Sequence, residues 1–264
     1  MENTVSCIIP TYNNGEELVR AVKSVIGSNY RFKEIIVVDD GSKTDFAKTV
    51  LNDFRPLSGI NPVYLYQRNQ GPSAARNAGL TRATSTWVAF LDADDTMLPD
   101  SVTDKLEWVA HVDEPGQVGG VYGSFVWSSS GEVQPFAREQ ISVRRDDIGR
   151  FGRAPGGVPS YLLQRRAVAE VGGFDESMWF NEDFDLILRM MKRGYKVVGT
   201  DSPGFIRNVS GVSLTRRDKS RSLVGGRRFL LKAWREGLLS RREIVRRMGV
   251  NYLSHCRQLF RSSD

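Results

Sequence analysis

Histidine and cysteine are scarce in this chain, with two of each among its 264 residues. Two histidines, His111 and His255, exclude a His-rich metal site, and Cys7 and Cys256 do not form the paired spacing of a zinc site. We expect both cysteines to be reduced and chemically inert, as is usual in cytosolic proteins. Any metal would therefore need oxygen ligands, which suit Mg²⁺ or Mn²⁺.

Long apolar runs are missing as well. No segment approaches the ~20 apolar residues that cross a bilayer, and the first residues lack the basic-then-apolar pattern of a secretory leader. A Gly-x-Gly-x-x-Gly turn is also absent after the first apolar segment, where residues 10–15 read Pro-Thr-Tyr-Asn-Asn-Gly. These absences lead us to expect a cytoplasmic protein, and they count against a nucleotide-dependent oxidoreductase.

Acidic residues are sparse at the end of the chain, where basic ones gather. Residues 216–264 hold 14 lysines and arginines against four acids, whereas the rest of the chain is mildly acidic. Arginine pairs alternate there with apolar residues, so a basic amphipathic helix could lie on the inner face of an anionic membrane, with Phe229, Trp234 and Leu238 as anchors. The alternative is two packing helices, split near Gly237, whose basic faces are solvated. No nucleic-acid motif accompanies the charge, so we expect no nucleic-acid partner.

Apolar segments alternate with segments of helical periodicity over the first hundred residues. We predict strands over 5–9, 34–38, 63–66 and 87–91, and helices over 16–26, 44–54 and 71–83. After residue 99 the pattern predicts a helix over 100–112, irregular strands over 118–127, 133–136 and 160–163, and helices from 166 and over 182–193. This pattern indicates an α/β protein with a mostly parallel sheet and helices on both faces. Ligands of such sheets bind beyond the carboxyl ends of the strands.

Three carboxylates follow the apolar run that begins at Trp87: Asp92, Asp94 and Asp95. In an extended chain, Asp92 and Asp94 would point to the same face. Like charges this close need a cation or donors between them, so the cluster is a candidate Mg²⁺ or Mn²⁺ site. The alternative is a polar turn in which Asp95 caps the next helix.

Four segments in this order resemble the inverting nucleotide-sugar glycosyltransferases of family 2, which have the Rossmann-like GT-A fold. They are residues 8–13, 37–42, 71–79 and 90–95, and residues 172–175 with 181–185 match the acceptor half of that family. The resemblance implies a GT-A domain over 1–215, with a nucleotide-binding half (1–99) and an acceptor half (100–215). Residues 216–264 would then form a helical C-terminal appendage.

The resemblance also implies roles for single residues. Asp40 would accept the N–H of the base, Pro10, Thr11 and Tyr12 would lie at the nucleotide, and Arg76 would pair with Asp40 or the nucleotide. Asp94 would contact the ribose, Asp95 would hold the metal and Asp92 would support them. On the residues alone, Asp40 could instead belong to a strand-to-helix turn, and Arg76 to a surface ion pair.

In the acceptor half, the resemblance makes Asp183 the general base, with Glu182 and Asp175 on the acceptor side. One base opposite the leaving group implies inversion at the anomeric carbon. The alternative is that the Glu182-Asp183 pair caps a helix.

Two departures from the family pattern qualify the resemblance. Val209 stands where an Arg-x-His segment would place an additional metal ligand, and the Gln-x-x-Arg-Trp segment of processive synthases is absent. We therefore expect a metal-dependent, non-processive enzyme. It would move one sugar from a nucleotide-sugar donor, most simply a UDP-sugar, to a glycan or lipid-linked acceptor. The competing interpretation is a transferase-like binding or scaffold protein without activity, against which Asp94, Asp95 and Asp183 argue.

Overall fold

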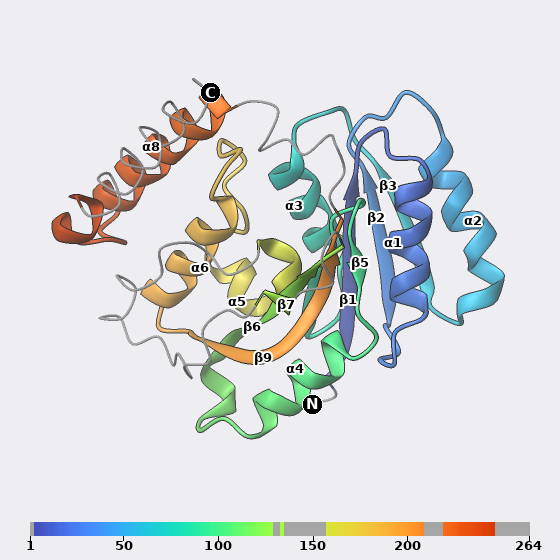
Figure 1. Cartoon of the computed structure of the whole chain (residues 1–264), viewed down its shortest axis with the longest axis horizontal. Coiled ribbons are helices and arrows are strands. Elements are labelled where there is room, and N and C mark those ends of the chain that lie inside the picture. Colours follow the sequence, from blue (N-terminus) through green and yellow to red (C-terminus); the bar gives the residue numbers. More distant parts are fainter. Residues whose placement is uncertain (1–2, 129–132, 135–156, 209–218, 246–264) are drawn as a thin grey trace, which may run out of the picture.

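The first half of the chain forms a parallel sheet in the computed structural model, which describes residues 3–128, 133–134, 157–208 and 219–245 (Figure 1). The strands are β1 (Val5–Thr11), β2 (Glu34–Asp39), β3 (Asn61–Tyr66) and β4 (Trp87–Phe90), in the order β3-β2-β1-β4. All three pairings are parallel, as the sequence predicted. The carboxyl ends of the four strands therefore lie at one edge of the sheet.

The helices that connect these strands cover both faces of the sheet. They are α1 (Glu16–Ile26), α2 (Phe46–Ser58) and α3 (Pro72–Arg82). Apolar residues of α1 and α2 pack with Cys7 and Ile9 on one face, whereas Ala75 of α3 packs with Ile8 on the other. Gly79 lets α3 approach closely, because a Cβ there would lie 2.5 Å from a methyl carbon of Ile8.

The second half extends the same sheet with strands of both directions. Strand β8 (Tyr161–Gln164) runs antiparallel to β4 and to β6 (Val118–Trp127), and β6 pairs in parallel with β9 (Lys196–Arg207). The short strands β5 (Thr96–Met97) and β7 (Val133–Gln134) pair with β9 and β6. The remaining elements are α4 (Ser101–Ala110), η1 (Pro115–Gln117), η3 (Val158–Ser160), α5 (Arg165–Glu170), α6 (Glu182–Lys192) and α8 (Lys219–Arg235).

Strand β9 was not predicted from the sequence. It contains Pro203 and two glycines, which usually interrupt strands. Strand β9 pairs with β6 despite three register irregularities. The contacts with β6 therefore outweigh the low strand propensity of the proline and the glycines.

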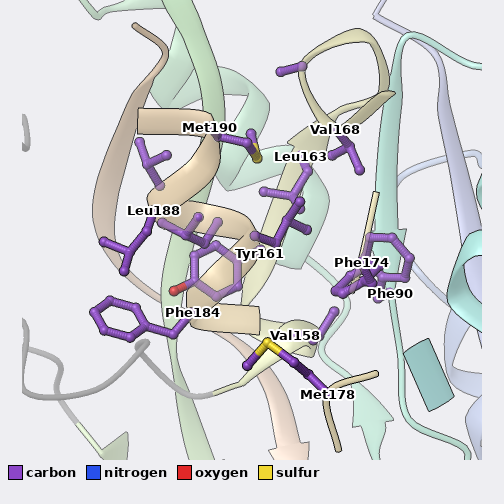
Figure 2. Packing of buried hydrophobic residues seen from close by; sticks show 14 of the residues in the cluster. Phe90, Val158, Tyr161, Leu163, Val168, Phe174, Met178, Phe184, Leu188 and Met190 are labelled. Atoms are coloured by element: carbon purple, nitrogen blue, oxygen red, sulfur yellow. The ribbon is translucent and has the colours of Figure 1, made fainter. Parts of the chain in front are cut away.

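The second-half core lies between the sheet and helices α5 and α6 (Figure 2). Phe90 at the end of β4 packs edge-to-face on Phe174, with ring centroids 5.2 Å apart. Phe184 of α6 extends the same cluster toward α8. One continuous core therefore joins the strand end that carries the aspartates to the helix that begins with Glu182 and Asp183.

Helix α8 lies on the outer side of α6, away from α1 and α2 (Figure 1). Phe229 and Ala233 of α8 and Leu238 beyond it are buried in the core, and the Phe229 ring lies 5.4 Å from that of Phe184. The expectation that Phe229 and Leu238 anchor the chain in a membrane is therefore wrong, whereas Trp234 is exposed.

Among the helices that the structure describes, none is both long enough and apolar enough to cross a bilayer. The expected boundary at 215/216, together with Cys256 and His255, lies outside the described residues.

Candidate active site

The loops after β1 and β2 lie together at the carboxyl edge of the sheet. The Asp40 amide donates to the Thr11 carbonyl at 2.9 Å, and the Asn13 amide donates to the Ser42 hydroxyl at 2.8 Å. Thr11 is buried and Pro10 is half-buried, while the Tyr12 side chain is 50% exposed. Of the three residues expected at the nucleotide, Tyr12 presents the most surface to a ligand.

The buried Asp40 carboxylate accepts hydrogen bonds from the loop that leads into α3. Its donors are Gln67 Nε2 at 2.7 Å, the Gln70 amide at 2.9 Å and the Gly71 amide at 2.8 Å. A carboxylate offers about four acceptor positions, so roughly one remains for a ligand donor. Gln67 and Gln70 were missed by the sequence analysis, and only the neighbouring Gly-Pro start of α3 marked this loop.

Arg76 of α3 links the loop after β4 to the start of α6. Its buried guanidinium donates to Asp92 Oδ1 at 2.9 Å and to Glu182 Oε1 at 3.0 Å, and it lies 5.5 Å from the centroid of the Phe174 ring. Burial alone would lower the pKa of Arg76, but the two carboxylates raise it, so the group stays charged. In the structure Arg76 pairs with neither Asp40 nor an exposed carboxylate, so those two interpretations are wrong, whereas a contact between Arg76 and the nucleotide stays a prediction.

The aspartates after β4 form a turn rather than an extended segment. Strand β4 ends at Phe90, and the Asp95 amide donates to the Asp92 carbonyl at 3.0 Å. Asp95 does not cap the next helix, because α4 begins at Ser101 after Asp100. The expected sharing of one strand face by Asp92 and Asp94 is therefore wrong.

The turn nevertheless gathers the three carboxylates. Burial, with the nearby charges of Asp92 and Asp94, raises the pKa of Asp95 to about 8, although the Asn208 amide and Arg207 oppose this rise. Such a pKa means that the ionised cluster is unfavourable unless positive charge is brought to it.

Asn208, at the end of β9, holds this turn and was missed by the sequence analysis. Its amide donates to Asp95 Oδ1 at 3.1 Å, and its side chain donates to the Asp94 carbonyl at 2.7 Å. The preceding Arg207 lies 4.8 Å from the centroid of the Phe125 ring. The only sequence signal for Asn208 was its position within the segment where the family has Arg-x-His. Val209, the third residue of that segment, lies outside the described residues.

Helix α6 begins beside this cluster. Asn181, at φ 60°, precedes the helix, so neither Glu182 nor Asp183 occupies the N-cap position. Asp183 Oδ1 accepts the Phe184 amide at 2.7 Å, and Oδ2 lies 3.9 Å from where a Cβ on Gly157 would be. Burial raises the pKa of Asp183, and burial together with the Asp183 charge raises that of Glu182 to about 7. A carboxylate with a raised pKa is a better proton acceptor near neutral pH.

The structure therefore brings together Arg76, Asp92, Asp94, Asp95, Glu182 and Asp183. Asp175, expected on the acceptor side, is engaged elsewhere: it accepts from Lys232 Nζ at 2.6 Å and from Ser177 Oγ at 2.7 Å. Although partial burial opposes the shift, these donors lower the pKa of Asp175 to about 2. Across the described ranges, no three His, Cys, Asp or Glu residues are placed to hold a metal by themselves.

Two solved structures share this fold. Staphylococcus aureus TarS 1–349 has a TM-score of 0.69 at 17% identity, covering 92% of this chain and 71% of that one. The mannosyltransferase PcManGT from Pyrobaculum calidifontis, in complex with GDP-Man and Mn²⁺, has a TM-score of 0.65 at 19% identity, covering 88% and 64%. At these identities the likeness concerns the fold, which is GT-A.

Proteins with similar sequences include a glycosyltransferase. The pre-mycofactocin glycosyltransferase of Mycobacterium tuberculosis is 34% identical over 206 residues, which cover 73% of this chain but only 40% of that protein. The succinoglycan biosynthesis protein ExoO of Rhizobium meliloti is 26% identical over 80% of this chain and 62% of its own length. The model of the family "Glycosyl transferase family 2" matches residues 6–172. The chain therefore belongs to glycosyl transferase family 2.

Proposed function

We propose that the chain is a metal-dependent, inverting glycosyltransferase that adds one sugar at a time to a glycan or lipid-linked acceptor. The observation that carries the proposal is that the buried Arg76 pairs with Asp92 of the turn and with Glu182, the neighbour of Asp183, so the two carboxylate groups lie on either side of one guanidinium. The negative charge of the Asp92–Asp95 turn suits a cation, which in turn would bind the diphosphate, and Asp183 has a carboxylate with a raised pKa that suits it to take a proton.

The donor is a nucleotide sugar, and a UDP-sugar is our first choice. Two TarS structures of the same fold are complexes with UDP and with UDP-GlcNAc, whereas PcManGT was solved with GDP-Man. Asp40 supports recognition of the base, because its remaining acceptor position suits the N–H of a uracil. The Tyr12 side chain, half exposed beside it, supports contact with the base ring.

A divalent cation, Mn²⁺ or Mg²⁺, fits the carboxylates of this site. Asp95 and Asp94 would hold it, with Asp92 in support, and phosphate oxygens of the donor would complete its shell because the described residues alone do not. Bound there, the ion would neutralise charge on the diphosphate leaving group. The raised pKa of Asp95 is the observation that favours this fit, since a cation would relieve the repulsion that causes it.

The residues of the chain account for the remaining steps. Asp183 takes the proton of the acceptor hydroxyl while that oxygen attacks the anomeric carbon, and the bond to the diphosphate breaks on the opposite face, so the configuration inverts. Arg76 positions both sides, because it holds Asp92 and Glu182 at once. Glu182 is thereby a positioning residue, since its carboxylate is occupied by Arg76.

Asp183→Asn tests the assignment of the base. The amide keeps the shape but cannot accept the proton, so sugar transfer should fall by about 10²–10⁴-fold while the affinity for UDP with Mn²⁺ stays within about twofold. A screen of UDP-, GDP- and dTDP-sugars first identifies the donor by hydrolysis with the wild-type chain, and Asp53→Asn on the distant α2 is the control. Turnover of the Asp183→Asn chain at the wild-type rate would exclude Asp183 as the base.

A further inference from the structure

The outward side of helix α8 carries large apolar side chains in contact with solvent. Val224, Leu231 and Trp234 are 52%, 52% and 57% exposed. Spacings of seven and three residues place them along one side of the helix. We call these three residues the outer face of α8.

The opposite side of α8 is fixed to the body of the protein. Phe229 and Ala233 are buried in the core, and Lys232 donates to Asp175 Oδ2 at 2.6 Å and to Asp185 Oδ2 at 2.9 Å. Because this side is held by packing and by two carboxylates, the helix cannot rotate to bury Leu231 and Trp234. Among the described residues, the outer face therefore stays turned away from the core.

Arginines surround the outer face. Arg227, Arg228 and Arg235 are exposed on the same helix, and Arg241 and Arg242 are exposed just beyond it. Between residues 224 and 242 the sequence has a single acid, Glu236. A tryptophan and aliphatic side chains among arginines suit the boundary of an anionic lipid bilayer, where apolar groups enter the acyl region and cations meet headgroup phosphates.

We propose that the outer face of α8, with its arginines, binds the surface of an anionic membrane. A second copy of the chain fits this surface less well, since a two-fold contact would set each arginine cluster against the other. This refines the expectation from the sequence, because Phe229 and Leu238 are core residues and the contact falls to Val224, Leu231 and Trp234 instead.

The position of α8 gives the contact a consequence for the active site. Phe180 packs against Gly225 of α8, where a Cβ would lie 2.8 Å from its ring, and Trp179 lies against Gly71. These aromatic residues lie two to four positions before Glu182 and Asp183, so a bilayer on α8 would lie next to the acceptor side. A lipid-linked acceptor would then reach Asp183 from the membrane, a consequence that rests on the proposed function, whereas membrane binding itself does not.

Cosedimentation with vesicles tests the proposal on the full chain. One set of vesicles is phosphatidylcholine, and the other is equal parts phosphatidylcholine and phosphatidylglycerol. We expect binding to the anionic vesicles only, with an affinity that falls as salt is raised. Arg227→Gln with Arg228→Gln should lower the partition coefficient about 30-fold at low salt, corresponding to about 1 kcal/mol per arginine.

The apolar part needs its own variant and a matched control. Leu231→Ser with Trp234→Ser should lower binding at least about tenfold by removing the inserted apolar surface. Tyr66→Ser, an equally exposed aromatic on β3, should leave binding unchanged. Thermal melts and UDP affinity of each variant show whether it is folded and keep this test separate from that of the proposed function.

Three results would overturn the proposal: equal binding to both vesicle types, no binding to either, or dimers in sedimentation velocity that dissociate in the Leu231/Trp234 variant. The last would assign the outer face to a second copy of the chain.

Discussion

Arg76→Met probes the buried ion pairs that join the two sides of the candidate site. The Arg76 side chain is 6% exposed and lies 2.9 Å from Asp92 and 3.0 Å from Glu182, which are 35% and 14% exposed. Removal of one partner from a buried pair costs about 3–5 kcal/mol of unfolding free energy. Most of that loss should come from Glu182, because Asp92 can be hydrated.

The loss should depend on pH. Burial and the Asp183 charge raise the pKa of Glu182 to about 7 even with Arg76 present. A carboxyl whose pKa is raised by folding contributes stability that is full below its unfolded pKa, about 4.5, and is lost as the pH rises through the folded value. Without Arg76 the ionised form is less favourable still, so the deficit of Arg76→Met should be larger at pH 8 than at pH 5.

Urea denaturation in EDTA at pH 5 and pH 8 measures this. Arg82→Met, at an exposed position of the same helix, should cost under about 0.5 kcal/mol at either pH. Glu182→Gln should restore part of the loss in the double variant, with a coupling of about 1–3 kcal/mol. An Arg76→Met deficit that is equal at both pH values, together with no rescue by Glu182→Gln, would refute this account of the pair.

Two further substitutions test the surroundings of the site. Lys232→Met should lower the unfolding free energy by about 1–3 kcal/mol and speed proteolysis within α8, because fully buried Asp185 loses a charged donor. Arg228→Met is the exposed control. Equal proteolysis of the two variants would argue against the role of Lys232 in holding α8 to the body of the protein. Gly41→Ala should weaken UDP binding and cost about 1–3 kcal/mol, because φ is +84° and a Cβ would lie 2.7 Å from the Asn69 amide nitrogen beside the Asp40 loop. Gly15→Ala, where nothing lies within 4 Å of the Cβ, is its control, and wild-type affinity in Gly41→Ala would show that this loop is not needed.

The parallel part of the fold was predictable because its signals are local. Apolar runs bounded by turn residues predicted β1 to β4, and helical spacing predicted α1 over its observed range, Glu16–Ile26. Because the ends of parallel strands meet at one edge, the location of Asp40 and of the Asp92–Asp95 turn at the carboxyl edge of the sheet followed from the same signals.

The remaining features depend on contacts that are distant in sequence. Arg76 reaches Glu182 across 106 positions, and no local pattern gives that pairing. Helix α8 has apolar residues on two sides, and only its packing on Phe184 decides that Phe229 is buried while Trp234 is exposed. The turn at Asp92–Asp95 depends likewise on Asn208, from the far end of the chain's last described strand.

The most direct test of the central claim is calorimetry of UDP binding to the full chain with Mn²⁺ and with EDTA. We expect binding with Mn²⁺ to be at least about tenfold tighter than in EDTA, since the carboxylates and the phosphates share the cation. We also expect Asp95→Asn to remove most of this difference, whereas Asp104→Asn, at a half-buried position of α4, should preserve it. Equal affinity for UDP with Mn²⁺ and in EDTA would contradict the account.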